Sequence, residues 1–225
     1  MARRAWLWIG GGVFCAALAW CAWWYLFVLG RIDRPGGGAS ALILDAAIFS
    51  VFALHHSLFA RDFAKRWFAR LTPQLVRSVY VYAASLLLIA ACALWRPIGG
   101  ELYRASGAAA IALGAIELGG VALIARSAAR IDPLELAGIH APRAGGPLIT
   151  GGPYQIVRHP LYLGWVLAVF GTPHMTGDRL AFAALSTAYL ALAVPFEERS
   201  LARDFPAEYE RYRRAVRWRI VPFIY

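Results

Sequence analysis

The sequence is poor in cysteine and in charged residues, and both shortages limit what the protein can be. Only 3 of its 225 residues are cysteine and 16% are charged, whereas 60% are hydrophobic. This composition lies outside the range of soluble globular domains. The cysteines, Cys15, Cys21 and Cys92, all fall in apolar stretches and lack the spacing of metal ligands. We interpret them as packing residues and expect no metal site.

Long apolar runs take up most of the chain. A helix needs roughly 20 apolar residues to cross a hydrocarbon core of about 30 Å. Four runs reach that length or come close: Trp6–Leu29, Ala41–Ala60, Ser78–Trp95 and Ala108–Ala125. Two shorter runs, Leu161–Thr172 and Leu180–Phe196, predict a tight helical hairpin, because the first would be only about 18 Å long as a helix. The predicted fold class is all-α: a multi-span transmembrane helical bundle of four spans plus a C-terminal helical hairpin and a cytoplasmic amphipathic tail.

We expect a single membrane domain over residues 1–225, with the four spans in 1–125 and a cofactor-binding loop, the hairpin and the tail in 126–225. Arg61–Gln74 alternates aromatic and basic residues and predicts a helix lying at the membrane interface. A charged helix is predicted over Arg199–Arg217. No internal repeat is visible, which weakens the case for an inverted-repeat transporter. The first apolar run is too long for a removable signal peptide and lacks a cleavage site.

The formal charge of +10 follows the predicted topology rather than a nucleic-acid-binding face. With the N-terminus in the cytoplasm, 18 of the 23 basic residues fall on the inner side of the membrane and 5 on the outer side. Enrichment of Lys and Arg in inner loops sets orientation. We therefore predict a multi-pass protein of a bacterial inner membrane with both termini cytoplasmic. The basic charge also attracts anionic membrane lipids, and no nucleic-acid partner is expected.

A polar loop precedes the hairpin, and residues 151–164 read Gly-Gly-Pro-Tyr-Gln-Ile-Val-Arg-His-Pro-Leu-Tyr-Leu-Gly. Proline has a fixed φ and no N–H, so Pro160 suits the first turn of the hairpin helix, with His159 at or near its cap. The free N–H groups at such a helix start favour an anionic or hydroxyl-bearing ligand. The plainer alternative is a capped helix start with Arg158 touching lipid phosphates.

Two adjacent carboxylates, Glu197 and Glu198, follow the last apolar run. Burying such groups is costly, so they should be paired or bound to a ligand. In the functional interpretation, one carboxylate binds the ribose hydroxyls or the amino group of a cofactor, and the other pairs with Arg158 or with an arginine of the tail. In the alternative, both lie at a solvated helix end and pair with Arg199 or Arg203.

This loop and acidic pair resemble the C-terminal half of the integral-membrane methyltransferases. That family includes the isoprenylcysteine carboxyl methyltransferases, the phospholipid methyltransferases and the methanethiol S-methyltransferases. The resemblance covers roughly residues 145–225. It implies an S-adenosylmethionine pocket lined by Leu148, Ile149, Tyr154, His159, Pro160, Tyr162 and Glu197. Stretches 52–57, 77–80 and 171–176, together with Trp67, look most like the methanethiol S-methyltransferases.

The resemblance implies a methyltransferase that uses S-adenosylmethionine, with a small thiol such as methanethiol as acceptor. The isoprenylcysteine enzymes carry a substrate-binding arginine four residues before the first glutamate, where this chain has Ala193. A prenylated cysteine is therefore disfavoured as acceptor. Two alternatives stay open. One is another lipid-soluble acceptor, a lipid amine or an isoprenoid, and the other is a non-enzymatic membrane assembly or transport factor.

Transfer to a thiol needs a thiolate, yet a free thiol with a pKa near 8.5 is only a few per cent ionised at neutral pH. A neutral histidine could take that proton, and His56 is the predicted base. Arg158 and Glu198 complete the predicted catalytic group. Asp45 and Glu117 fall inside spans, where carboxylates are functional candidates. We expect Glu117 to be a protonated, hydrogen-bonded structural group.

Overall fold

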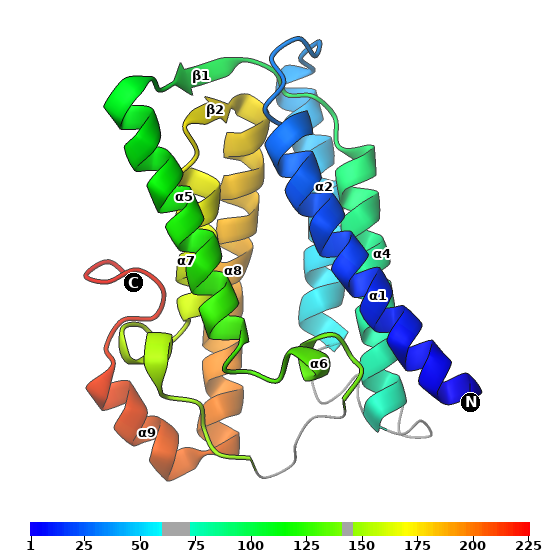
Figure 1. The fold of residues 1–225 in the computed structure, drawn as a ribbon, viewed down its shortest axis with the longest axis vertical. Coiled ribbons are helices and arrows are strands. Elements are labelled where there is room, and N and C mark those ends of the chain that lie inside the picture. Colours follow the sequence, from blue (N-terminus) through cyan, green and yellow to red (C-terminus); the bar gives the residue numbers. More distant parts are fainter. Residues whose placement is uncertain (60–72, 141–145) are drawn as a thin grey trace. The chain divides into compact units, whose positions relative to one another are not determined.

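A computed structural model describes residues 1–59, 73–140 and 146–225 (Figure 1). Most of their regular structure is helical. The strands among the described residues are Glu101–Arg104 (β1) and His174–Thr176 (β2), which pair in a small sheet. The prediction of an all-α membrane bundle is confirmed. Most of the predicted interfacial helix Arg61–Gln74 lies outside the described residues, as does Trp67.

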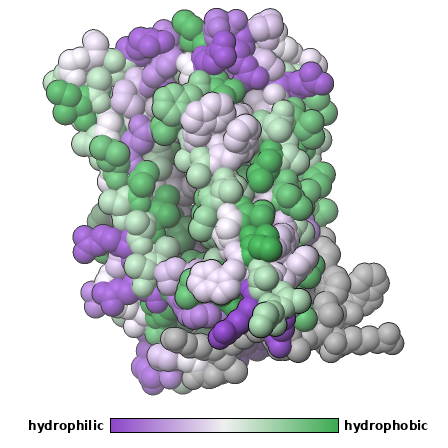
Figure 2. Space-filling model, turned by 45° about the vertical axis from the view of Figure 1, so that its right-hand side comes forward, coloured by the Kyte–Doolittle hydropathy of each residue, from purple (hydrophilic) through white to green (hydrophobic). Residues whose placement is uncertain are grey.

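Five of the described helices are long and apolar enough to cross a membrane. They are α1 (Ala2–Trp23), which continues as the π-helical turn η1 (Trp24–Val28), α2 (Gly38–Phe59), α4 (Pro73–Leu94), α5 (Gly107–Ala128) and α8 (Gly177–Asp204). Large apolar side chains on them are exposed, including Ile111 at 75% and Leu192 at 70%. On the face in Figure 2, hydrophilic side chains gather at the helix ends and the length between is mostly apolar. The chain is therefore a multi-pass membrane protein.

The first arm of the hairpin is α7 (Pro160–Phe170), whose 11 residues make a helix of about 16 Å, too short to cross alone. It lies directly against the backbone of α5. A Cβ on Gly120 would come within 2.6 Å of the carbonyl oxygen of Gly164, and one on Gly171 within 2.8 Å of the main-chain nitrogen of Glu117. Small residues permit such close approach of membrane helices. This contact fixes α7 along α5.

The second arm differs from the prediction. The apolar pattern predicted an end at Phe196, but α8 continues to Asp204, through Pro195 and past both glutamates. Hydropathy marks where a helix leaves the apolar layer and not where its hydrogen bonding stops. The predicted tail helix Arg199–Arg217 is thus wrong in its extent. Its first six residues belong to α8, and a separate short helix α9 (Pro206–Ala215) follows, begun by a proline in a position that suits the first helical turn.

The chain forms two compact units. The first comprises residues 1–101, 132–144 and 176–179, and the second comprises residues 102–131, 145–175 and 180–225. The long segment between α5 and α7 contains a helical turn α6 (Pro133–Leu136) and a 3-10 turn η2 (Gly152–Gln155). The domain division expected from the sequence stays a prediction.

Two fully buried aspartates organise the first unit. Asp178, in the first turn of α8, accepts hydrogen bonds from the indole N–H of Trp95 at 2.9 Å and from the main-chain N–H groups of residues 98–99 at 3.1 Å. Asp45 accepts one from the main-chain N–H of Arg96 at 2.8 Å. Neutral donors thus satisfy both carboxylate oxygens of Asp178 and one oxygen of Asp45. Both aspartates hold the chain that follows α4.

Candidate functional site

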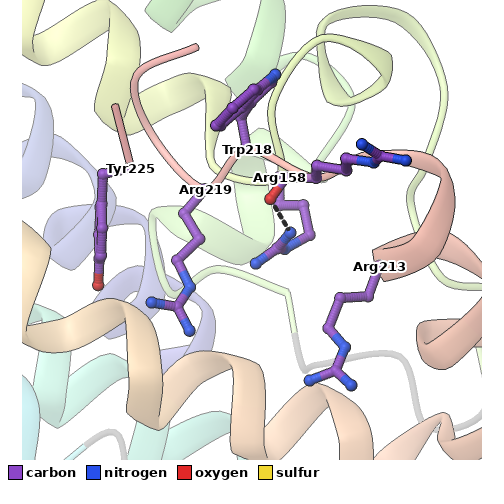
Figure 3. A pocket seen from close by; sticks show the side chains of 6 residues that line it. Arg158, Arg213, Trp218, Arg219 and Tyr225 are labelled. Carbon is purple, nitrogen blue, oxygen red and sulfur yellow. Dashed lines mark hydrogen bonds between the residues drawn. The ribbon is translucent and has the colours of Figure 1, made fainter. Parts of the chain in front are cut away.

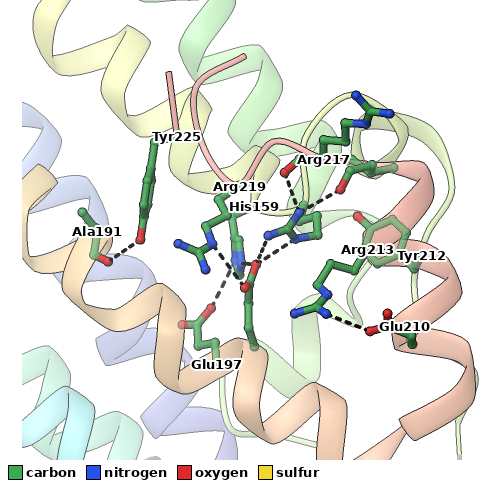
Figure 4. Close-up of polar contacts among 12 residues, drawn as sticks. His159, Ala191, Glu197, Glu210, Tyr212, Arg213, Arg217, Arg219 and Tyr225 are labelled. Atoms are coloured by element: carbon green, nitrogen blue, oxygen red, sulfur yellow. Dashed lines mark hydrogen bonds and ion pairs between the residues drawn. The ribbon is translucent and has the colours of Figure 1, made fainter. Parts of the chain in front are cut away.

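The loop before α7 lies in the second unit, and glycine and proline shape it. Gly152 has a φ of 66°, and a Cβ there would lie 2.9 Å from the guanidinium of Arg130, so the position requires glycine. Pro160 begins α7, and His159 is the N-cap residue. The His159 side chain makes no capping hydrogen bond. Its ring faces the two glutamates of α8 instead (Figure 4).

Arg158 joins this loop to the segment after α9. Its guanidinium donates to the main-chain carbonyls of Val216 at 2.8 Å and Arg217 at 2.7 Å, and it pairs with Glu198 at 2.7 Å. Its main-chain N–H donates to the carbonyl of Trp218 at 2.9 Å. The residue is only 7% exposed. The guanidinium of Arg158 therefore makes these hydrogen bonds and its ion pair within the protein.

Glu198 lies between two arginines from different segments. Its carboxylate pairs with Arg158 at 2.7 Å and with Arg219 at 3.3 Å. It is 7% exposed, and a buried carboxylate without partners would cost several kcal/mol. Tyr209 is buried close by. Burial and the negative charge of Glu198 raise the pKa of Tyr209 to about 12. Glu198 therefore ties α8 to both the loop and the tail.

His159 is buried between aromatic and acidic groups. Its ring stacks on Tyr162, with centroids 5.4 Å apart and an interplanar angle of 12°. Its Nδ1 lies 3.4 Å from Glu197 and its Nε2 lies 3.4 Å from Glu198. Burial disfavours the charged ring, but the two carboxylates outweigh burial and raise the pKa of His159 above its ordinary value. The ring is thus stabilised in its protonated form.

Glu197 differs from its neighbour in exposure. Its side chain is 45% exposed, against 9% for Glu198. One carboxylate oxygen accepts a hydrogen bond from the hydroxyl of Tyr162, and the other faces His159. The protein thus orients a carboxylate that is half-exposed.

The tail packs on the loop through a tyrosine cluster. Tyr209, Tyr212 and Val216 form a buried core, against which Leu148 and Tyr154 of the loop pack. The hydroxyl of Tyr212 donates to the main-chain carbonyl of Tyr154 at 2.7 Å. Burial and the nearby Glu197 raise the pKa of Tyr154. The position of the loop thus depends on the tail.

Two basic pockets lie beside these contacts. One of about 380 Å³ is lined by Arg158, Arg213, Arg217, Trp218, Arg219 and Tyr225 (Figure 3). Another of about 260 Å³ is lined in part by Glu198, Tyr209 and Arg213. The seven residues predicted to bind the cofactor line neither of these two pockets. The pockets and the predicted cofactor contacts adjoin at the pair formed by Arg158 and Glu198.

Comparison with known proteins identifies the family. The model of the phospholipid methyltransferase family matches residues 138–208. Methanethiol S-methyltransferase 2 of Bradyrhizobium diazoefficiens is 38% identical over 82% of this chain and 75% of its own length. The methanethiol S-methyltransferase of Crocosphaera subtropica is 36% identical over 82% of this chain and 76% of its own. The chain belongs to the methanethiol S-methyltransferase family.

This chain is therefore a membrane methyltransferase, and the non-enzymatic alternative is set aside. Nurim of Sus scrofa is also similar, at 29% identity over 71% of this chain and 68% of its own length. No solved structure matches. The expected resemblance to integral-membrane methyltransferases is confirmed.

The methyltransferase brings most of the predicted cofactor residues together in its second unit. His159, Tyr162 and Glu197 contact one another directly. Leu148 and Tyr154 pack on the tail. Pro160 is fully buried at the start of α7, and Ile149 is half-buried in the loop. Their roles toward a methyl donor stay predictions.

The predicted base, His56, belongs to the first unit of the methyltransferase. It is half-buried near the end of α2, with its Nδ1 2.8 Å from the hydroxyl of Tyr80. The ring of neighbouring His55 stacks on Tyr80, with centroids 5.7 Å apart. A tyrosine hydroxyl at this distance orients the imidazole. The catalytic assignment of His56 stays a prediction.

Sequence reasoning missed part of the tail. The face formed by Tyr209, Tyr212 and Val216 was visible as a stripe at helical spacing. The pairing of Trp218 and Arg219 with the loop was not, because both residues accept from the loop through main-chain carbonyls. Main-chain hydrogen bonds of this kind do not depend on residue type, so the sequence does not reveal them.

Proposed function

We propose that the methyltransferase transfers the methyl group of S-adenosylmethionine to methanethiol, giving dimethyl sulfide and S-adenosylhomocysteine. The observation that carries this proposal is the similarity, over four fifths of the chain, to two proteins that are named methanethiol S-methyltransferases. The donor supplies an electrophilic methyl on a positively charged sulfur. The thiolate sulfur forms a bond to that methyl carbon as the carbon–sulfonium bond breaks, and the thiol proton leaves to a base.

The half-exposed Glu197 is the group best suited to hold the donor. Its half-exposed carboxylate is of the chemical type that binds ribose hydroxyls or an ammonium group. Tyr162 and His159 orient it from inside the protein. Leu148, Ile149 and Tyr154 supply the apolar and aromatic surface that an adenosyl group requires, and the buried Pro160 fixes the start of α7. On this proposal Arg158 and Glu198 act as positioning residues, because they are buried and paired with each other.

The base must be unprotonated at working pH. The two carboxylates stabilise the protonated form of His159, which makes it a poor proton acceptor. We therefore keep His56 as the proposed base, with Tyr80 orienting its ring. The arginine distribution supports an orientation with both termini in the cytoplasm, and we propose a bacterial inner membrane as the location.

A second acceptor class is favoured by one observation, the match of residues 138–208 to the phospholipid methyltransferase model. A lipid amine would receive the methyl group at nitrogen, and the product would stay in the membrane. The two candidate acceptors give methylated products with different physical properties. A small thiol gives a volatile product, whereas a lipid amine gives an extractable one.

The test uses the purified full chain in proteoliposomes with labelled S-adenosylmethionine and methanethiol. We expect labelled dimethyl sulfide in the headspace, and a loss of about 10- to 100-fold in Glu197→Ala. Glu208→Ala removes an exposed carboxylate of α9 and should retain full activity. Label in the lipid extract would instead favour the second acceptor. No transfer to either acceptor by folded protein would refute both.

A further inference from the structure

The larger basic pocket, of about 380 Å³, is lined by none of the residues that are proposed to contact the methyl donor. Four arginines line it, and only two glutamates pair with them. Glu198 pairs with Arg158 and Arg219, and Glu210 pairs with Arg213. Glu210 also pairs with Arg214 outside the pocket. The pocket wall therefore carries an excess of positive charge.

The geometry of these groups suits a phosphate. Figure 3 shows the guanidinium of Arg158 between those of Arg219 and Arg213. Guanidinium groups present forked donors that match the oxygens of a phosphate. Arg217 is exposed at the edge of the pocket and forms no ion pair with a residue that the structure describes. The rings of Trp218 and Tyr225 complete the wall, and both residue types favour the membrane–water interface.

The adjoining loop, Val221–Tyr225, presents apolar side chains in a strained conformation. Phe223 is 83% exposed and Ile224 is 81% exposed. Phe223 has a φ of 68°, unlike every other described non-glycine residue, and such a conformation is unfavourable for a residue with a Cβ. The main-chain oxygen of Tyr225 holds the loop by accepting from the N–H groups of residues 219–221 at 2.9 to 3.1 Å.

The loop lies beside the apolar part of α8. The hydroxyl of Tyr225 donates to the carbonyl of Ala191 at 3.4 Å. Ala191 precedes Glu197 by six residues, which is about 9 Å along the helix axis. Next to it, Leu192 is 70% exposed, as a lipid-facing side chain would be. The exposed Phe223 and Ile224 are therefore placed within reach of the acyl region.

We propose that this part of the tail, residues 213–225, binds the head group of an anionic phospholipid. The three pocket arginines that belong to the tail bind its phosphate, and Phe223 and Ile224 enter the adjoining acyl layer. Charge complementarity selects the anionic lipid over a zwitterionic one. The proposal holds whichever acceptor receives the methyl group.

Native mass spectrometry of the detergent-solubilised full chain tests it, with phosphatidylglycerol and phosphatidylcholine of the same acyl length as probes. We expect the parent to retain phosphatidylglycerol at least about tenfold more tightly, since each arginine near the head group contributes about a factor of five. The Arg213→Gln/Arg217→Gln variant should lose this preference. Phe223→Gly relieves the strained φ and should also weaken retention, without unfolding the chain.

Arg211→Gln is the matched control, because Arg211 is exposed on α9 and lines neither pocket. It should retain phosphatidylglycerol as the parent does. An equal loss in this control, or equal retention of both lipids by the parent, would overturn the proposal. Retention of inorganic phosphate without retention of phosphatidylglycerol would assign the pocket to a soluble anion. A loss of S-adenosylhomocysteine affinity in the double variant would assign it to the methyl donor. Either result overturns the lipid assignment.

Discussion

Two buried carboxylates on the same helix, Asp178 and Glu198, are satisfied in opposite ways. Asp178 accepts from an indole and two main-chain N–H groups and stays in the first unit. Glu198 accepts from two guanidinium groups and stays in the second. Neutral donors fix a loop with little dependence on other charges. A shared ion pair makes several segments depend on one another.

The contrast extends to the neighbour of Glu198. Glu197 has a half-exposed side chain and uses its inner contacts only for orientation. Adjacent helical positions point about 100° apart, so one carboxylate faces the protein interior and the next faces outward. The acidic pair therefore divides into a buried residue and a half-exposed one.

The largest effect should come from breaking the ion pair of Glu198. Glu198→Ala leaves Arg158 buried without its charge partner and should lower the free energy of unfolding by about 3 kcal/mol or more. Thermal unfolding in detergent measures the loss, and faster proteolysis after the tail arginines should accompany it. Arg158→Met combined with Glu198→Leu should recover most of the stability. If the double variant does not recover stability, Arg158 and Glu198 stabilise the fold through more than their mutual ion pair.

Glu197→Ala should separate binding from stability. We expect S-adenosylhomocysteine affinity to fall about 10- to 100-fold, the value of a hydrogen bond to a charged group, with a smaller fall in unfolding temperature than in Glu198→Ala. Isothermal titration calorimetry of the purified protein measures the affinity, with Glu208→Ala as control. Unchanged affinity would exclude Glu197 from the donor site and would remove the proposed functional difference between Glu197 and Glu198.

Much of this contrast follows from the sequence, and the remainder depends on long-range packing. The apolar runs predict the spans, and Pro160 predicts the start of α7, because both depend on local composition and backbone geometry. The division of labour between Glu197 and Glu198 was visible only as two alternatives. Which carboxylate is buried depends on where Arg219 lies, and that is set by the fold of the tail.

A smaller effect is expected from Asp178→Asn in the first unit. The amide keeps one acceptor oxygen for the donors but loses the second and places an N–H₂ group near Trp95. We expect a loss of about 1–3 kcal/mol in unfolding free energy, with S-adenosylhomocysteine affinity unchanged. Thermal unfolding and calorimetry measured on the same preparation test this. Loss of affinity would show that the two carboxylates are not independent.

The smallest effect concerns pH. The folded-state pKa of His159 is raised by Glu197 and Glu198, so its protonated form contributes stability that is fully present below the ordinary histidine pKa of about 6.5. That contribution is lost as the pH rises through the raised pKa. The parent should therefore lose more stability than His159→Gln between neutral and mildly alkaline pH. Parallel unfolding curves for the two proteins would contradict the assigned ion pairs.

The hydrogen bonds from Arg158 and His159 to residues 216–219 also set an order of events during synthesis. The loop leaves the ribosome well before its partners do, and α8 must be inserted between the two. Until residues 216–219 emerge, the guanidinium of Arg158 has no carbonyls to bind, and Glu198 lacks Arg219. A chain truncated after Ala215 should insert its spans and bind no S-adenosylhomocysteine. The proposed donor site is thus completed only after every span is in the membrane, so an incompletely inserted chain cannot consume the methyl donor.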